Sequence, residues 1–270
     1  TDHHHRCLYD ALPGQRVQRV NMKLGVSSKI ILIVEFAVFV VAVSCGSAAL
    51  FVQKNTIEEG TARQLQSVSV LKEYNIKRFI DFAVGELEFY SDKDDTRGIF
   101  VDFLQNDTIA RYQDVHATFA DMLDKDFFLD VFLMDEEGVI VASSDTTEEG
   151  KIRSGESFFL NAKKETAVQD FRYDVTTEKP ELILTSPITD MDGAFLGILA
   201  TKIKLEEVSN ILSEKSGLGE TGETFLLNSF NLVVTDLLKE PRAALKKTVY
   251  SPQIMDCLKG NSISGVRKDY

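Results

Sequence analysis

In the stretch FLMDEEGVIVASSD, residues 132–145, a polar Asp-Glu-Glu-Gly turn separates two short apolar runs. This pattern is typical of an antiparallel hairpin with a tight turn. Three more strand-like runs follow, and a short helix at 157–164 lies between the second and third strands. The predicted strands are 131–134, 139–143, 168–173, 182–188 and 195–203. Their connections are too short for parallel crossovers, so we predict an α+β fold with an antiparallel sheet.

The same pattern returns in FLLNSFNLVVTDLL, residues 225–238, where Phe225 stands 93 positions after Phe132. This internal repeat predicts a second unit of the same kind, with its first strands at 224–228 and 232–235. Few strand-like runs remain before the last residue, so we expect the second unit to be incomplete.

Helical periodicity occupies the region before the first strand. From residue 54 to about residue 90, apolar residues recur at steps of three and four. They are Leu65, Val68, Ile76, Phe79, Ala83, Leu87 and Tyr90. We expect this stretch to be a stalk helix whose apolar stripe packs against both the domain and a dimer partner.

Four shorter helices are also predicted. Apolar periodicity indicates helices at 99–104, 109–123 and 205–215. A fourth is expected to begin at Ser251-Pro252, which are good N-cap and first-turn residues, and to end at Gly260.

Residues Ile30 to Val52 form one apolar run of 23 residues, long enough to span a bilayer as a helix. Its one charge, Glu35, lies near an end of the run, where it is tolerated more easily. Lys23 and Lys29 precede the run, so the positive-inside rule places the N-terminus in the cytoplasm. We expect the span to continue directly into the stalk. A cleaved signal peptide or a lipobox ending at Cys45 is the alternative, but neither pattern fits well.

Composition narrows the classes of function. The chain carries 30 basic and 42 acidic residues, a net charge of −12, which argues against nucleic-acid binding. Hydrophobic residues make up 44%, enough for a folded core. With Cys45 in the apolar run, Cys257 is the one thiol expected outside the membrane, so no disulfide is predicted there.

No catalytic motif stands out. Residues 217–222, GLGETG, match the glycine pattern of dinucleotide-binding loops, but a predicted helix precedes them and a predicted strand follows, the reverse of the required context. The sequence has no P-loop, no zinc motif and no Cys/His cluster, and His116 is the one histidine beyond the N-terminal tract. We therefore predict no catalytic residue, no metal and no cofactor in these residues.

The order of these segments resembles that of a known family. It runs from a basic-flanked membrane helix through a stalk helix and a sensor-like unit to a second unit opened by GLGETGETFLLN, residues 217–228. The segments are similar to the double-Cache, or tandem PAS-like, extracytoplasmic domains of bacterial transmembrane receptors, over residues 23–270. The pattern Pro187-x-x-Asp190-x-x-Gly193-x-x-x-Gly197 resembles the last hairpin of the family's first unit. In that family, a second membrane helix and a cytoplasmic output module follow.

The resemblance implies a domain order. The cytoplasmic N-terminus is 1–29, with 1–21 interpreted as an extension before a start-like Met22. The membrane helix is 30–52, stalk and packing helices are 53–126, the membrane-distal unit is 127–215 and the start of the membrane-proximal unit is 216–270.

The resemblance also implies a ligand site in the distal unit, between the sheet and the helix that joins its second and third strands. There Phe158 and Phe159 resemble the family's paired aromatics, although simple core packing explains them equally well. Arg172, Tyr173 and Asp190 are further candidates from the strands, against the alternative that they are ordinary surface or sheet residues. The chain departs from the family's amino-acid-binding pattern at two positions, with Glu156 in place of an arginine and Lys202 in place of an acid.

The resulting hypothesis is a small-molecule sensor in the bacterial inner membrane, with residues 53–270 outside the cytoplasm and a homodimer formed through the stalk. Its output is expected to be a histidine kinase, with a diguanylate cyclase or a chemotaxis receptor as alternatives. A membrane-anchored binding protein without output remains the other class of function.

Overall fold

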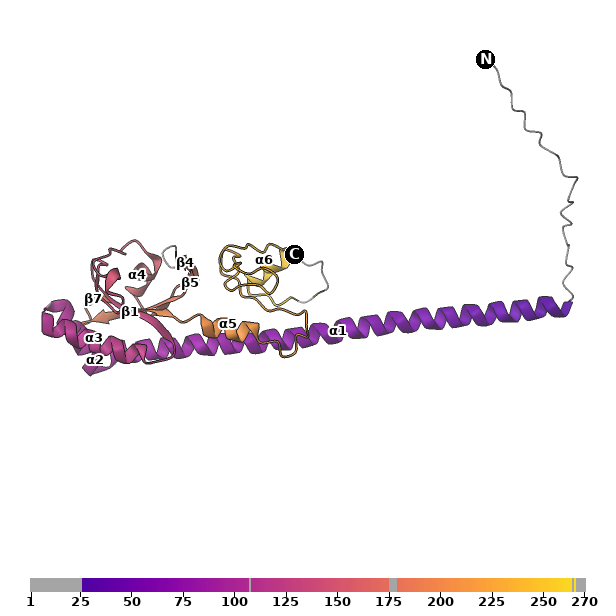
Figure 1. Ribbon diagram of the computed structural model, residues 1–270, viewed down its shortest axis with the longest axis horizontal. Coiled ribbons are helices and arrows are strands. Elements are labelled where there is room, and N and C mark those ends of the chain that lie inside the picture. Colours follow the sequence, from indigo (N-terminus) through magenta and orange to yellow (C-terminus); the bar gives the residue numbers. More distant parts are fainter. Residues whose placement is uncertain (1–25, 107, 175–178, 264, 266–270) are drawn as a thin grey trace, which may run out of the picture. The chain divides into compact units, whose positions relative to one another are not determined.

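The computed structural model describes residues 26–106, 108–174, 179–263 and 265 (Figure 1). Residues 1–21, interpreted above as an extension, and the basic residue Lys23 lie outside the described part. The chain divides into two compact units, Thr1–Ile57 and Glu58–Tyr270. One long helix, α1 (Val26–Asp92), begins in the first unit and ends in the second, so the predicted membrane segment and stalk belong to a single helix.

In the first unit, the side chains of α1 are exposed. Large apolar side chains such as those of Phe36 and Phe51 are 70% and 67% exposed. Within the described residues, α1 is the one helix long and apolar enough to cross a membrane, judged by length and composition. Exposed apolar side chains of this density fit a lipid environment better than water.

The second unit is built on the C-terminal half of α1 and two helices that follow it, α2 (Asp94–Gln105) and α3 (Ile109–Leu123). The predicted apolar stripe is buried where α1 meets the domain, at Ile76, Ala83, Leu87 and Tyr90, whereas Leu65 is 44% exposed. Helix α3 has the predicted bounds. Helix α2 begins five residues earlier than predicted, because acidic residues in its first turn favour a helix N-terminus.

The predicted antiparallel sheet is present, with the strand order β2-β1-β7-β6-β3. Its strands are β1 (Phe128–Asp135), β2 (Ile140–Ser143), β3 (Ala167–Val168), β6 (Ile183–Thr189) and β7 (Phe195–Ile203). A separate hairpin is formed by β4 (Arg172–Asp174) and β5 (Lys179–Glu181). The predicted α+β class is therefore confirmed.

The prediction of one strand over 168–173 was wrong. The backbone pairs with β6 only through β3 and then leaves the sheet, and β4 pairs with β5 instead. The reason lies at Asp170, whose carboxylate accepts hydrogen bonds from the backbone amides of Phe171 (2.8 Å) and of Ser229 (2.9 Å), a residue 59 positions away. These bonds hold the chain in a bend where a straight strand was expected.

The sheet separates two cores. On one face, α1, α2 and α3 cover buried residues that include Phe100, Phe119 and Leu133. On the other face lies α4 (Ser157–Ala162), which is the short helix predicted between the second and third strands (Figure 1). The central strands approach closely at Gly197, where a Cβ atom would lie 2.0 Å from the carbonyl oxygen of Met134. Only glycine fits at that point of the β1–β7 ladder.

After β7, helix α5 (Glu206–Ser213) packs on α1 through Val208, Leu212 and Ile76. Its C-terminal end is held by Lys72 of α1, whose Nζ donates hydrogen bonds to the carbonyl oxygens of Ile211 (2.6 Å), Leu212 (2.9 Å) and Glu214 (2.6 Å). A cation at this end of a helix satisfies carbonyls that lack a helical partner. Burial lowers the pKa of the Lys72 ammonium, and the nearby Glu214 carboxylate partly opposes that effect.

The segment that follows forms a small core of its own around Val233, Leu237, Ala243 and Val249. The predicted strands 224–228 and 232–235 are absent among the described residues, which show only single bridges such as Leu227 with Val233. The amide of Val233 bonds to Lys247 (3.0 Å), so the backbone groups of this segment are shared among several loops and form no ladder.

The last helix, α6 (Pro252–Cys257), begins where predicted. The side chain of Ser251 accepts a hydrogen bond from the amide of Ile254 at 3.2 Å, as an N-cap does. The helix ends at Cys257, and Gly260, with a φ of 86°, closes the turn that follows.

Candidate functional site

The candidate site lies on the α4 side of the sheet, where the sequence places the paired aromatics. Phe158 and Phe159 of α4 are buried, at 2% and 1% exposure, and pack against residues of β1, β6 and β7. The ring of Phe158 meets that of Phe132 edge to face, with centroids 6.1 Å apart. Both phenylalanines are therefore core residues in this structure, and Phe158 also forms part of a charged recess described next.

Beside Phe158 is a void of about 10 Å³. It is lined by Asp130, Phe132, Ile140, Glu148, Arg153, Phe158, Arg172, Ile183 and Lys202. Such a space holds about one water molecule at most, so no organic ligand fits without movement of the side chains around it. Five of the nine lining residues are charged, which is unusual for so enclosed a place in a domain core.

Arg172, on β4, is fixed from three sides. Its Nε donates to Glu181 of β5, and its Nη1 donates to Glu156 at 2.8 Å. Its guanidinium also lies over the ring of Phe158, 5.6 Å from the centroid. These contacts hold the guanidinium plane in one orientation, as a residue prepared to bind a planar anion would be held.

Lys202, on β7, is less completely paired. Its Nζ lies 3.5 Å from a carboxylate oxygen of Asp130 and 3.8 Å from one of Glu181. Both separations allow an ion pair but exceed good hydrogen-bond length. The same Asp130 accepts a hydrogen bond from the hydroxyl of Ser144.

The third cation, Arg153, follows the short 3₁₀ helix η1 (Thr146–Glu148). Its Nη2 donates to Glu148 at 2.8 Å, and its Nη1 lies 3.9 Å from Glu156. Burial alone would raise the pKa of the Glu148 carboxyl, but hydrogen bonds from Lys151 and Arg153 outweigh burial and hold that pKa below its usual value. Glu148 is therefore an anion at neutral pH.

Two of the predicted site residues lie elsewhere. The ring of Tyr173 faces Lys246, whose Nζ is 5.0 Å from its centroid. Asp190 shapes the turn between β6 and β7, because its carboxylate accepts from the amides of Asp192 (2.9 Å) and Ala194 (2.8 Å). The structure thus brings Phe158 and Arg172 together around the void, with Phe159 next to them on α4. It does not bring Tyr173 or Asp190 there.

The sequence-based prediction missed four charged residues of the site, Asp130, Glu148, Arg153 and Glu181. A signal existed for two of them. Asp130 stands inside the apolar strand β1, and Glu181 ends β5, two positions before the apolar strand β6 begins. A charge in a buried strand has to be paired, so each marks a polar site within the core.

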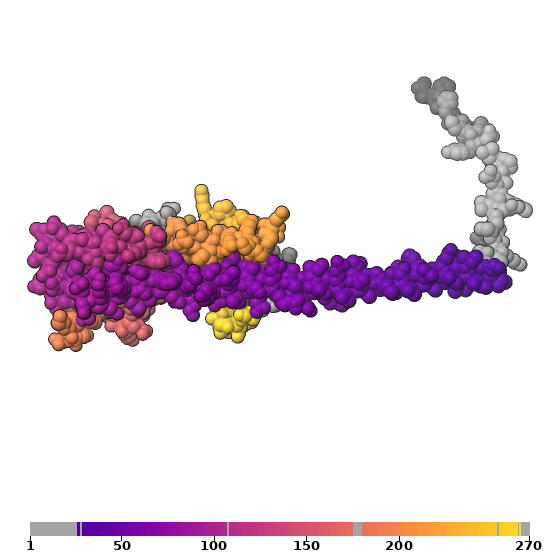
Figure 2. Space-filling view, turned by 90° about the horizontal axis from the view of Figure 1, so that it is seen from below, coloured from indigo at the N-terminus to yellow at the C-terminus, as the bar shows by residue number. Residues whose placement is uncertain are grey.

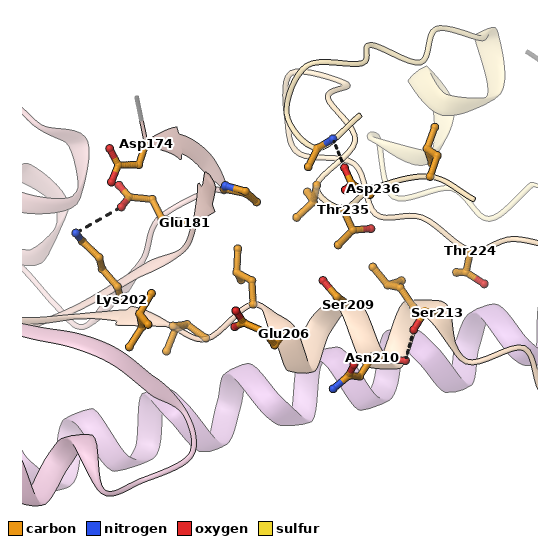
Figure 3. A pocket seen from close by; sticks show the side chains of 18 of the residues that line it. Asp174, Glu181, Lys202, Glu206, Ser209, Asn210, Ser213, Thr224, Thr235 and Asp236 are labelled. Atoms are coloured by element: carbon orange, nitrogen blue, oxygen red, sulfur yellow. Dashed lines mark hydrogen bonds and ion pairs between the residues drawn. The ribbon is translucent and has the colours of Figure 1, made fainter. Parts of the chain in front are cut away.

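A much larger cleft of about 1110 Å³ adjoins the void, and Figure 3 shows side chains that line it. Asp130 and Lys202 line both spaces, so the cleft and the void share a wall. Lys202 and Glu181 lie at one side of the cleft, the α5 side chains Glu206 and Ser209 along its floor, and Asp236 at the other side (Figure 3). Among the described residues there is no cluster of His, Cys, Asp and Glu that could hold a metal ion.

Comparison with known proteins places the chain in a family. A family model described as a Cache domain matches residues 52–269. No curated protein sequence matches the chain. The crystal structure of the Vibrio cholerae histidine kinase DctB sensor domain superposes with a TM-score of 0.54 at 17% identity, over 75% of this chain and 76% of that one.

A second solved structure, the ligand-binding domain of the Pseudomonas fluorescens chemoreceptor CtaA in complex with L-leucine, gives a TM-score of 0.50 at 14% identity, over 72% of this chain and 76% of that one. The same domain in complex with L-isoleucine gives 0.50 at 15% identity, over 72% and 75% of the two chains. At these identities, the likeness concerns the fold.

Proposed function

This chain belongs to the Cache domain family, and we propose that it is the sensor part of a bacterial transmembrane receptor. In this proposal, α1 anchors the chain in the inner membrane, residues 53–270 lie outside the cytoplasm, and the distal unit, 127–215, binds a small molecule. The output is proposed to be that of a sensor histidine kinase.

The observation that carries the proposal is the group of three cations, Arg153, Arg172 and Lys202, around a recess in the sensor sheet. Charged side chains are expensive to bury, and a fold keeps them inside a domain mostly where they bind or switch. Among the residues that the structure describes, we find no arrangement of nucleophile and base that would favour an enzyme.

The choice of output is supported by fold likeness to the sensor domain of a histidine kinase. The likeness to a chemoreceptor domain is nearly as good and supports a chemotaxis receptor as the second candidate. Both candidates make the same claim about the residues present here, namely that they bind a ligand and do no chemistry.

The anchoring role is supported by the length and exposure of α1. Lys29 precedes the apolar run, and Glu58 and Glu59 follow it. This asymmetry favours a cytoplasmic N-terminus and an extracytoplasmic sensor.

A homodimer through the stalk is supported by the exposed side of α1 in the second unit, seen in Figure 2. Leu71, Tyr74, Phe82 and Phe89 are each more than half exposed and recur at helical spacing. An apolar stripe of this kind, on the side of the helix that the domain leaves uncovered, suits a second copy of the same helix.

Signalling requires that the ligand bind two arrangements of the receptor with different affinity. The chain offers a short physical path for such a bias. Strand β7 carries Lys202 into the recess and runs directly into α5, and Lys72 fastens α5 to α1. A displacement of β7 on ligand binding would therefore reach the helix that enters the membrane.

The proposal is tested with the full chain in nanodiscs, by thermal shift against a panel of amino acids, organic acids, amines and sugars. Phe158→Leu should reduce the ligand-induced shift strongly, because it alters the wall of the recess. Phe119→Leu is the matched control, since Phe119 is equally buried but lies on the opposite face of the sheet. Both variants should lower the unliganded Tm similarly. A full ligand shift in Phe158→Leu would place the site elsewhere, with the adjoining cleft as the next candidate.

A further inference from the structure

We infer that Glu156 is a built-in competitor of the ligand: its carboxylate occupies the arginine groups that a small carboxylate ligand binds, and the ligand displaces it. This inference rests on the proposed function, since it presumes that the distal unit binds a small molecule. It adds the chemical class of the ligand and the residue that sets its affinity.

The first support is the position of the Glu156 carboxylate. One oxygen lies 2.8 Å from Nη1 of Arg172, and the other lies 3.9 Å from Nη1 of Arg153. Both arginines line the void, whereas Glu156 itself does not. The carboxylate therefore bridges two guanidinium groups of the site from outside, in the way that a ligand carboxylate would bridge them.

The second support is that Glu156 is the acid of the cluster most free to leave. Its side chain is 37% exposed, against 13% for Glu148, 10% for Asp130 and 7% for Glu181. Although Glu156 stands at the N-cap of α4, its side chain makes no capping hydrogen bond. When its carboxylate moves into water, no helix cap is lost and little desolvated surface is disturbed.

The third support is that the cations keep their places when Glu156 leaves. Arg172 remains bound through Nε to Glu181 and stacked on Phe158. Among the described residues, the Lys202 ammonium has two long ion pairs and no hydrogen bond, so it still has donors to offer. A prepared guanidinium and a loosely paired ammonium together favour an anion.

The exchange also conserves charge, which selects the ligand class. Replacing one carboxylate by another leaves each partly buried guanidinium neutralised. A neutral or cationic ligand that displaced Glu156 would remove one of the two anions beside each arginine, because only Glu181 would remain beside Arg172 and only Glu148 beside Arg153. The void is too small for simple insertion, so displacement is the route that the structure leaves to a carboxylate.

The test compares Kd values by calorimetry for the full chain and its variants in nanodiscs. The probes are propionate, lactate and succinate, with propionamide and propylamine as neutral and cationic counterparts of propionate. Glu156→Gln should bind the carboxylates about two- to fivefold more tightly, the range expected when one partly exposed competing ion pair is lost. Glu137→Gln removes the same charge from an exposed turn and should leave Kd unchanged.

Each outcome of these binding measurements either supports or overturns the inference. Tighter binding of carboxylates alone, in Glu156→Gln alone, supports the inference. Unchanged or weaker binding in that variant overturns the competitor role, and equal binding of propylamine or propionamide overturns the ligand class. If the broad panel gives a ligand that is not a carboxylate, this inference falls while the proposed function stands. If no molecule of any class stabilises either the unaltered chain or the variant, both fall.

Discussion

Lys72→Met removes the contact that ties α5 to the stalk. Lys72 is 4% exposed, and its ammonium is the donor for three backbone carbonyls at the end of α5. Methionine retains the apolar stem of the side chain, but it cannot donate a hydrogen bond to the end of α5. The substitution therefore isolates the polar contact.

The size of the effect follows from two opposing terms. Three carbonyl oxygens lose their donor, and each unsatisfied buried acceptor costs about 1–3 kcal/mol. The burial of an ammonium, which is itself unfavourable and lowers the pKa of Lys72, is relieved at the same time. We expect a net loss of about 2–4 kcal/mol, near the lower end of the first term. For a unit of this size, that loss corresponds to a fall in Tm of about 4–16 °C.

The assay is thermal unfolding of the full chain in nanodiscs at neutral pH, together with hydrogen exchange of the α5 amides. Lys77→Met is the control, because Lys77 is exposed on the same helix, and its effect should stay within about 0.5 kcal/mol. Exchange should accelerate in α5 in the Lys72 variant only. If the two variants have the same Tm and the same α5 exchange, the three hydrogen bonds do not hold α5, and the proposed path from β7 to α1 is refuted with them.

Three further predictions concern the sheet, the charged recess and the stalk. Gly197→Ala should lower the free energy of unfolding by about 3 kcal/mol, because the added Cβ would meet the Met134 carbonyl oxygen at 2.0 Å. Gly155→Ala, with open space around its Cβ, should be tolerated, and equal Tm values for the two variants would contradict this prediction. Because the folded protein lowers the pKa of Glu148, this residue stabilises the fold fully above pH 4.5, its usual pKa, and less as the pH falls below that value. Glu148→Gln should therefore reduce the loss of unfolding free energy at acidic pH, measured by denaturation at several pH values. Phe82→Cys should form a disulfide-linked dimer in membranes beyond the level of the unaltered chain, and a purely monomeric product would argue against the stalk dimer.

Local chemistry in the sequence determined the elements that depend on near neighbours. The helix 109–123 and the strand 195–203 have the predicted bounds, because hydrophobic periodicity over one element sets which face is buried. Gly138 and Gly193 mark tight turns that need a positive φ, and both adopt one. The order of these elements was enough to indicate the Cache fold, which the family match confirms.

Contacts between residues far apart in the sequence determined which side chains line the recess, and local sequence patterns did not predict this. The carboxylate of Asp170 binds a residue of the following segment, and this bond divides one expected strand into β3 and β4. As a result, Arg172 lies on a separate hairpin with its guanidinium over Phe158, and Tyr173 and Asp190 do not line the recess.

The charged recess is the clearest case of this dependence. Glu181 joins Arg172, nine positions before it, to Lys202 on β7. No local sequence pattern predicts which acid pairs with which cation, because the strength of an ion pair depends on the distance between the charges and on how far water is excluded around them. The sequence thus supplied the charges and the sheet that carries them, and only the packing of β4, β5 and β7 around α4 determined that those charges meet in one site.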